Sequence, residues 1–198
     1  MQQRSGETRE KILKSAFDAF AHEGYDTTGV AEICSAAGVS KGAFYHHFPS
    51  KQDVFITLLN DWLAEIDQAL AGAIRSSSTV AEGILAMADR ARGIFSSSDE
   101  RLPMFLEFWT RASRDPAVRQ AAIAPYRHYE GYFVDLIRRG IAEGSLDPVD
   151  PDLAARALVS LAVGLFFQGI LDPEGAAWDE IALGSIGLLM NGLKRRLV

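Results

Sequence analysis

The sequence has almost no cysteine and no long uninterrupted apolar run. Its one cysteine, Cys34, cannot form an intramolecular disulfide, which fits a reducing cytoplasm. The longest apolar stretch, residues 157–171, contains Ser160 and Gln168 and is shorter than the ~20 residues of a membrane span. Residues 1–11 also lack the apolar run of a signal peptide. We therefore expect a cytoplasmic protein that has no membrane partner.

Sequence signatures of common catalytic sites are also missing. There is no GxSxG, HExxH, P-loop or GxGxxG motif. The neighbouring carboxylates Asp99 and Glu100 fit the acidic first turn of a helix better than an acid–base pair. His46 and His47 would diverge by about 100° on a helix, and no Cys/His cluster accompanies them. We therefore expect no enzyme, no cofactor and no metal site.

No segment shows the apolar–polar alternation of a β-strand, whereas helical periodicity recurs along the chain. The 198 residues, 48% of them hydrophobic, can form a substantial core. We predict an all-α fold of about nine helices, in which Pro125 can kink or split the seventh. From capping signals the expected helices cover about 8–23, two short helices capped by Thr28 and Ser40, and then about 51–75, 79–95, 102–113, 116–143, 151–171 and 176–196.

The segment from Val30 to Lys51, VAEICSAAGVSKGAFYHHFPSK, is the most informative part of the chain. Gly38 suits a sharp turn because glycine adopts a positive φ without a Cβ clash. Ser40 is a good N-cap for a helix beginning at Lys41. Two short helices around a glycine turn make a helix-turn-helix, whose second helix can enter the DNA major groove. No residue from 39 to 51 is acidic, as a surface that binds a polyanion requires.

Eight residues in and beside this motif are candidates for DNA contact. Lys41 can reach a guanine edge or a phosphate, and Tyr45 can donate to a phosphate or rest on a thymine methyl. Hydroxyl groups at helix N-termini, such as those of Thr28 and Ser40, also bind phosphate. The predicted DNA-binding residues are Thr28, Ser40, Lys41, Gly42, Tyr45, His46, His47 and Lys51.

Residues 16–55 resemble the TetR (tetracycline-repressor-like) family of transcriptional regulators. The shared pattern consists of Gly24-Tyr25, Thr28, Ile33, Ala37-Gly38-Val39-Ser40, Gly42, Tyr45, His47-Phe48 and Lys51. Cys34 and Gly29 depart from it, but both are small residues that leave the fold intact. The resemblance implies DNA contacts at the matching positions and an effector pocket among the fourth to eighth helices.

Charge and pattern together divide the chain into a helix-turn-helix DNA-binding domain (1–50) and an effector-binding and dimerisation domain (51–198). Residues 1–51 carry six basic and six acidic side chains, so the net charge of −6 falls on the remainder. Aromatic residues of the second domain should line a pocket for an apolar or aromatic effector, with ordinary core packing as the alternative. The candidates are Phe105, Phe108, Trp109, Tyr126, Tyr129, Phe133 and Phe166.

The last two expected helices are more apolar than a helix with one buried face needs to be. A second subunit would cover the additional surface in a four-helix bundle, whereas burial inside a monomer is the alternative. The predicted interface residues are Leu158, Leu161, Leu165, Ile186, Leu189 and Leu193.

We interpret the sequence as a ligand-responsive DNA-binding transcriptional regulator. We expect a homodimeric repressor that a small effector releases from a near-palindromic double-stranded operator. One alternative is a helical small-molecule-binding protein or enzyme that no longer binds DNA, but the presence of Lys41, Tyr45 and Lys51 argues against it. The other is an activator or adaptor whose main partner is a protein.

Overall fold

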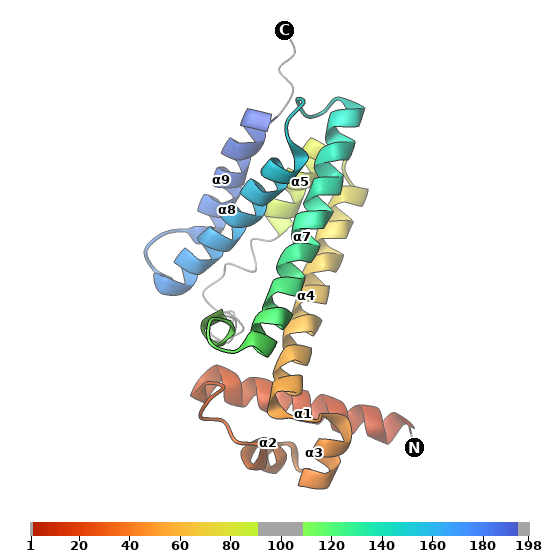
Figure 1. Cartoon of the computed structure of the whole chain (residues 1–198), viewed down its shortest axis with the longest axis vertical. Helices are drawn as coiled ribbons and strands as arrows, with labels where there is room; N and C mark the ends of the chain where they lie inside the picture. Colours follow the sequence, from red (N-terminus) through yellow and green to blue (C-terminus); the bar gives the residue numbers. More distant parts are fainter. Residues whose placement is uncertain (1, 91–108, 194–198) are drawn as a thin grey trace. The chain divides into compact units, whose positions relative to one another are not determined.

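The computed structural model describes residues 2–90 and 109–193, and every regular element in these ranges is a helix. The predicted all-α fold is confirmed (Figure 1). Residues 109–112 are also helical, but most of the helix expected at about 102–113 lies outside the described residues. The helices with defined bounds are α1 (Gln2–Glu23), α2 (Val30–Ala37), α3 (Lys41–His47), α4 (Lys51–Arg75), α5 (Val80–Arg90), α7 (Pro116–Glu143), α8 (Pro151–Leu171) and α9 (Trp178–Leu193).

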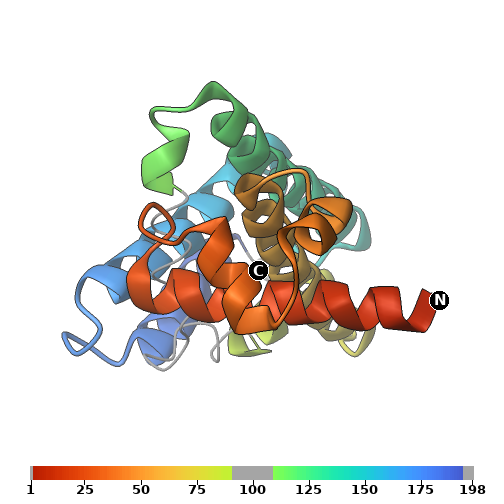
Figure 2. The ribbon, with the colours of Figure 1, turned by 90° about the horizontal axis from the view of Figure 1, so that it is seen from below.

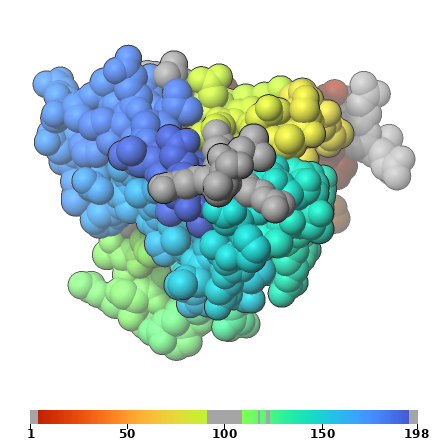
Figure 3. Space-filling model, turned by 90° about the horizontal axis from the view of Figure 1, so that it is seen from above, coloured from red at the N-terminus to blue at the C-terminus, as the bar shows by residue number. Residues whose placement is uncertain are grey.

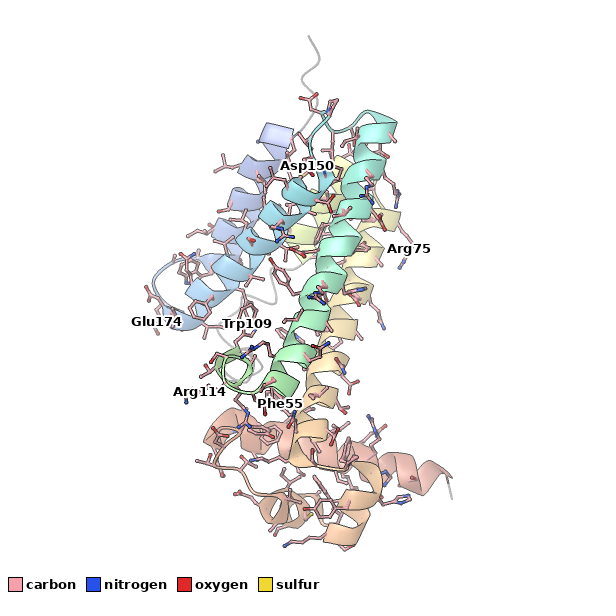
Figure 4. All side chains as sticks on the ribbon, viewed as in Figure 1. Phe55, Arg75, Trp109, Arg114, Asp150 and Glu174 are labelled. Carbon is pink, nitrogen blue, oxygen red and sulfur yellow. The ribbon has the colours of Figure 1, made fainter. Side chains whose placement is uncertain are left out.

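Local capping signals set several of these boundaries. The Ser40 hydroxyl accepts a hydrogen bond from the backbone N–H of Ala43 at 3.1 Å at the start of α3. The Asp150 carboxylate accepts the N–H groups of residues 152 and 153 at the start of α8, at 2.9 and 3.2 Å (Figure 4). Helix α7 continues through Pro125 without being split. By contrast, α1 begins at Gln2, several residues before the predicted start.

The described residues form two compact units. The first contains the chain up to Ala64 together with residues 109–116, and the second contains residues 65–90 and 117–193. The expected domain boundary after residue 50 falls just before α4. The first unit nevertheless includes the first turns of α4, because Phe55 on this helix completes its aromatic core.

The first unit is built around α1, against which α2 and α3 both pack (Figures 1 and 2). Three aromatic rings are in mutual contact in its core. The Phe20 centroid lies 5.2 Å from that of Tyr25 and 5.6 Å from that of Phe55, and the Tyr25 and Phe55 centroids are 5.0 Å apart. These tilted and edge-on arrangements are the favoured geometries of aromatic pairs, so the cluster ties α1 and the following turn to α4.

The second unit has its own apolar core, in which α5 and α8 both pack against α9. Gly83 on α5 allows a close approach to α4, because a Cβ there would lie only 2.5 Å from the Cδ1 atom of Ile74. The core includes Leu70, Val80, Ile84, Met87, Leu136, Ile137, Leu146, Leu158 and Met190. The unit therefore does not depend on the aromatic cluster of the first one for its core.

Helix α8 is both long and strongly apolar. Among the described helices, it has the length and the hydropathy, 1.7 on average over its most apolar window, to cross a membrane. Its buried residues are Ala154, Ala155, Leu158, Val159 and Leu165. Because α8 packs against α9 and buries these residues in its own unit, this composition is also that of a core helix.

The C-terminal end of α7 and the N-terminal end of α5 are joined by Glu143. Its carboxylate accepts the backbone N–H of Val80 at 2.5 Å and the hydroxyl of Ser145 at 2.6 Å. The first N–H groups of a helix have no partner within the helix, so Glu143 acts as a cap supplied from a distant part of the chain. The Ser145 hydrogen bond, followed by the bond from Val80, lowers the pKa of Glu143 below its ordinary value of 4.5.

We expect Glu143→Ala to destabilise the protein by about 1 kcal/mol at neutral pH, as removal of a helix cap does. Glu143→Gln keeps an acceptor and should have a smaller effect. A lowered folded-state pKa contributes stability that is present above 4.5 and lost as the pH falls through the folded value. The difference in Tm between wild type and Glu143→Gln should therefore shrink below about pH 4.5. A difference that is unchanged at pH 3 would contradict this role of the charge.

Candidate nucleic-acid interface

The turn between α2 and α3 has the geometry that the sequence predicts. Gly38 has φ 65° and donates its N–H to the Ser35 carbonyl at 3.2 Å. The N–H of Val39 bonds to the Cys34 carbonyl at 3.0 Å. These two bonds form a Schellman motif, which needs a left-handed residue at the glycine position. Gly38 therefore ends α2 and directs the chain into α3.

Helix α3 has one buried side and one exposed side. Phe44 and Phe48 are buried and anchor it to the first unit, with their ring centroids 6.1 Å apart. Tyr45 has 54% of its surface exposed, and its ring stands edge-on to that of Phe44. Among the predicted DNA-binding residues, Ser40, Lys41, Gly42, Tyr45 and His46 are exposed and His47 is half-buried. The Ser40 hydroxyl accepts the capping bond and can still donate its own hydrogen.

Thr28 does not lie where the sequence placed it. The N-cap of α2 is Gly29, and Thr28 is only 1% exposed. Its hydroxyl donates to the Gly24 carbonyl at 2.8 Å, which closes the turn after α1. The expected cap and phosphate contact at Thr28 are therefore wrong, because a buried hydroxyl that bonds within its own turn cannot reach DNA.

Lys51 also differs from the expectation of an outward-facing phosphate donor. Its side chain is half-buried, and its Nζ donates to the carbonyls of Tyr25 and Thr28, at 2.6 Å to the latter. The same ammonium group lies 4.2 Å from the centroid of the Tyr25 ring, a cation–π distance. Lys51 thus holds the turn between α1 and α2, and a phosphate contact would compete with these interactions.

Arg9 is a basic residue near α3 that the motif alone does not reveal. Its guanidinium lies 5.3 Å from the ring centroid of Phe48, the residue that ends α3. At the C-terminal end of α1, the Glu32 carboxyl raises the pKa of Glu23, first by a hydrogen bond and then by charge repulsion. A polyanion should therefore approach the exposed side of α3 and the Arg9 end of α1 rather than these two carboxyls.

The effector-binding residues expected from the sequence stay a prediction. Phe105 and Phe108 lie outside the described residues, and Trp109 belongs to the first unit, with 41% of its surface exposed. Tyr126, Tyr129, Phe133 and Phe166 are half-buried in the second unit. Burial, and then the Asp67 carboxylate, raise the pKa of Tyr129, and Asp67 also pairs with His128 at 3.4 Å. Tyr129 therefore links α7 to α4.

The expected dimer interface is partly incorrect as well. Leu158 and Leu165 are buried within the protomer, so they are not available to a second subunit. The reason is that α8 packs this side against its own unit. Leu161, Ile186, Leu189 and Leu193 are half-buried, and the last three pack against the core of the second unit. The large apolar residues of these two helices that are exposed are others: Leu153, Phe167, Leu171, Ile181 and Leu188.

Comparison with known proteins gives concordant matches. Residues 12–58 match the TetR family of bacterial regulatory proteins, and residues 94–182 match the C-terminal region of BetI-type transcriptional repressors. The chain is 30% identical over 137 residues to the HTH-type transcriptional regulator LmrA of Bacillus subtilis, covering 68% of this chain and 73% of that protein. It is also 30% identical over 155 residues to the repressor KstR2 of Mycolicibacterium smegmatis, covering 75% and 72%.

Solved structures agree in fold. A transcriptional regulator from Saccharomonospora viridis in complex with choline has a TM-score of 0.81 at 21% identity, covering 96% of this chain and all of that one. A TetR-family regulator from Mesorhizobium loti has a TM-score of 0.79 at 20% identity, covering 97% and 99%. These relatives are regulators of transcription rather than enzymes.

We expect Lys51→Ala to lower the free energy of unfolding by about 2 kcal/mol, because two carbonyls would lose a charged donor. Lys41→Ala removes the same charge from an exposed position and should leave the Tm within about a degree of wild type. Thermal unfolding followed by circular dichroism measures both effects. Equal Tm values for the two variants would show that the Lys51 ammonium does not hold the turn.

Proposed function

We propose that this chain, which belongs to the TetR family of bacterial transcriptional regulators, acts as a homodimeric repressor that a small effector releases from its operator. The observation that carries the proposal is the exposed side of α3. Lys41, Gly42 and Tyr45 lie there on a helix whose opposite side is fixed by buried Phe44 and Phe48. The repressor would work in the cytoplasm, where bacterial DNA lies.

Each exposed residue of α3 is suited to a particular part of DNA. Lys41, in the first turn, offers a charged donor to a guanine edge or a phosphate. Gly42 has no side chain to keep the backbone away from the groove, and a Cβ there would meet only the Ser40 hydroxyl, at 3.8 Å. Tyr45 and His46 extend the donor surface along the helix. Specific affinity requires more contacts than one such helix makes, so two subunits should bind two half-sites about 34–36 Å apart.

The surface of α8 supports a homodimer. One set of its residues, spaced three or four positions apart, is exposed except for half-buried Gly164, and in this set small residues in the middle are flanked by large apolar ones. A Cβ on Gly164 would meet no other atom, so nothing within the protomer fills the space beside it. A stripe of this kind allows two helices to approach closely. The stripe consists of Leu153, Ala157, Ser160, Gly164, Phe167 and Leu171.

Helix α9 continues this surface, because α8 and α9 lie side by side in the second unit (Figures 1 and 3). Ile181 and Leu188 are exposed on it, Leu188 to 77%, with exposed Gly184 between them. Leaving so many large apolar residues in water is unfavourable, by roughly 25 cal/mol for each Å². A second copy presents the same stripes and covers them in an isologous four-helix interface.

The aromatic residues of the second unit support an apolar or aromatic effector. Tyr126, Phe133 and Phe166 are half-buried, and such rings provide the walls of many small-molecule sites. The structural relative that holds choline indicates a second class, since aromatic faces also bind quaternary ammonium groups. Effector binding would release DNA only if the effector prefers a conformation with the wrong spacing of the two α3 helices.

Selection from random and genomic DNA, followed by footprinting, tests the proposal. We expect protection of an inverted repeat and an affinity that falls steeply with salt, because each phosphate contact releases counterions. Tyr45→Ala should weaken operator binding at least tenfold without changing Tm, since the side chain is largely exposed. Choline or an aromatic compound added to the bound complex then shows which class releases it. Failure to protect any inverted repeat would reject the repressor function.

We expect Leu188→Arg to convert the dimer into folded monomers and to remove high-affinity operator binding. The charge would be tolerated in a monomer because the position is exposed, but would be buried without a partner in the dimer. Gln120→Arg on α7, another exposed position, is the matched control and should remain dimeric. Sedimentation measures both variants. A Leu188→Arg dimer with normal operator affinity would place the interface elsewhere.

A further inference from the structure

Arg111 lies 85 residues beyond Asp26 in the sequence, yet the two form an ion pair within the first unit. The Arg111 guanidinium carbon is also 4.3 Å from the ring centroid of Tyr25, within cation–π range. Its side chain is 28% exposed, against 75% for Asp26, so the guanidinium is partly shielded from solvent. One cation thus contacts two consecutive residues of the turn between α1 and α2.

Both Lys51 and Arg111 contact the ring of Tyr25 in this turn. Its ring is buried in the cluster with Phe20 and Phe55, and it carries the Lys51 ammonium 4.2 Å from its centroid as well as Arg111. Two positive charges on one ring repel each other, and each therefore needs its own oxygen acceptor nearby. The turn carbonyls supply it for Lys51, and the Asp26 carboxylate supplies it for Arg111.

The turn determines where α2 begins. Gly24 has φ 86°, and its carbonyl accepts both the N–H and the hydroxyl of Thr28, the residue before the N-cap of α2. Helix α2 leads through the Gly38 turn directly into α3. A shift of Tyr25 or Asp26 would therefore be carried to the start of α2 and on to the helix that faces DNA.

Arg111 and the residues that it contacts lie in two stretches of the chain that match different family regions. It lies in the segment that matches the BetI-type C-terminal region, whereas Tyr25 and Asp26 lie in the segment that matches the TetR DNA-binding region. We infer that Arg111 is a positioning residue for DNA recognition: it holds the turn of residues 24–28 and thereby sets the orientation of α2 and α3. This inference rests on the proposed DNA-binding function.

The inference is tested with Arg111→Ala and, as a matched control, Arg114→Ala. Arg114 comes from the same segment and carries the same charge, but it is exposed, whereas the Arg111 side chain is partly shielded. Hydrogen exchange on the DNA-free protein measures the stability of the turn directly. We expect faster exchange of the amides of residues 25–33 in Arg111→Ala and wild-type exchange in Arg114→Ala. Identical exchange in both variants would overturn the inference.

Operator binding provides the second readout. Arg111→Ala should bind about tenfold more weakly than Arg114→Ala, with the salt dependence of wild type, because no phosphate contact is lost. Arg111→Lys keeps the cation and should recover part of the affinity. A salt slope reduced by about one contact would identify Arg111 as a phosphate ligand, and an unchanged affinity would show that the turn does not position α3; either result overturns the inference.

The two possible failures are distinguishable. If the wild-type dimer selects no operator, the proposed function is wrong and the role in recognition falls with it, while the exchange difference between the two alanine variants would still be seen. If the wild type binds an operator and Arg111→Ala binds it equally well, only the role of Arg111 is rejected.

Discussion

The geometry of the first unit depends on the interaction of the Lys51 ammonium with the turn after α1. Lys51 is the first residue of α4, where the helix dipole disfavours a positive charge. The carbonyls of Tyr25 and Thr28 and the Tyr25 ring offset this cost. Because the partners of Lys51 come from the turn that starts α2, the interaction fixes the distance between α4 and the helix-turn-helix. Together with buried Phe44 and Phe48, this interaction holds the elements that present the exposed residues of α3.

In the proposed dimer, the helices of the second unit would form a core and also leave apolar surface for a second copy of the chain. Gly83 permits α4 and α5 to pack closely, and Glu143 caps α5 from the end of α7. Helix α8 then uses Leu158 and Leu165 inside the unit and presents Leu153 and a row of small residues outside. Its nearly continuous apolar composition follows from these two tasks, and this also explains why it resembles a membrane span by hydropathy alone.

The sequence predicted the features that depend on near neighbours and missed those that depend on distant ones. Ser40 and Gly38 act through residues at most five positions away, so their roles could be derived from motif and spacing. The sequence pattern points to DNA contacts for Thr28 and Lys51, because both are polar residues at or near helix starts. Their actual partners are backbone carbonyls of a turn whose conformation the pattern does not reveal.

The same limit applies to the candidate interface and to Arg111. Periodicity shows that α8 and α9 are apolar on more than one side, but not whether a given leucine faces its own unit or a partner, and so Leu158 and Leu165 were misassigned. Nothing in the composition of the segment around Arg111 indicates a contact with Tyr25. Because this segment packs on the turn, the first unit, which contains the helix-turn-helix, is built from two separate parts of the sequence. A chimaera that joins this first unit to the second unit of another family member would therefore have to include residues 109–116 together with the N-terminal segment. Otherwise the other protein would have to supply an equivalent cation. Recombination at a single point near α4 would therefore separate the two parts of the first unit of this protein.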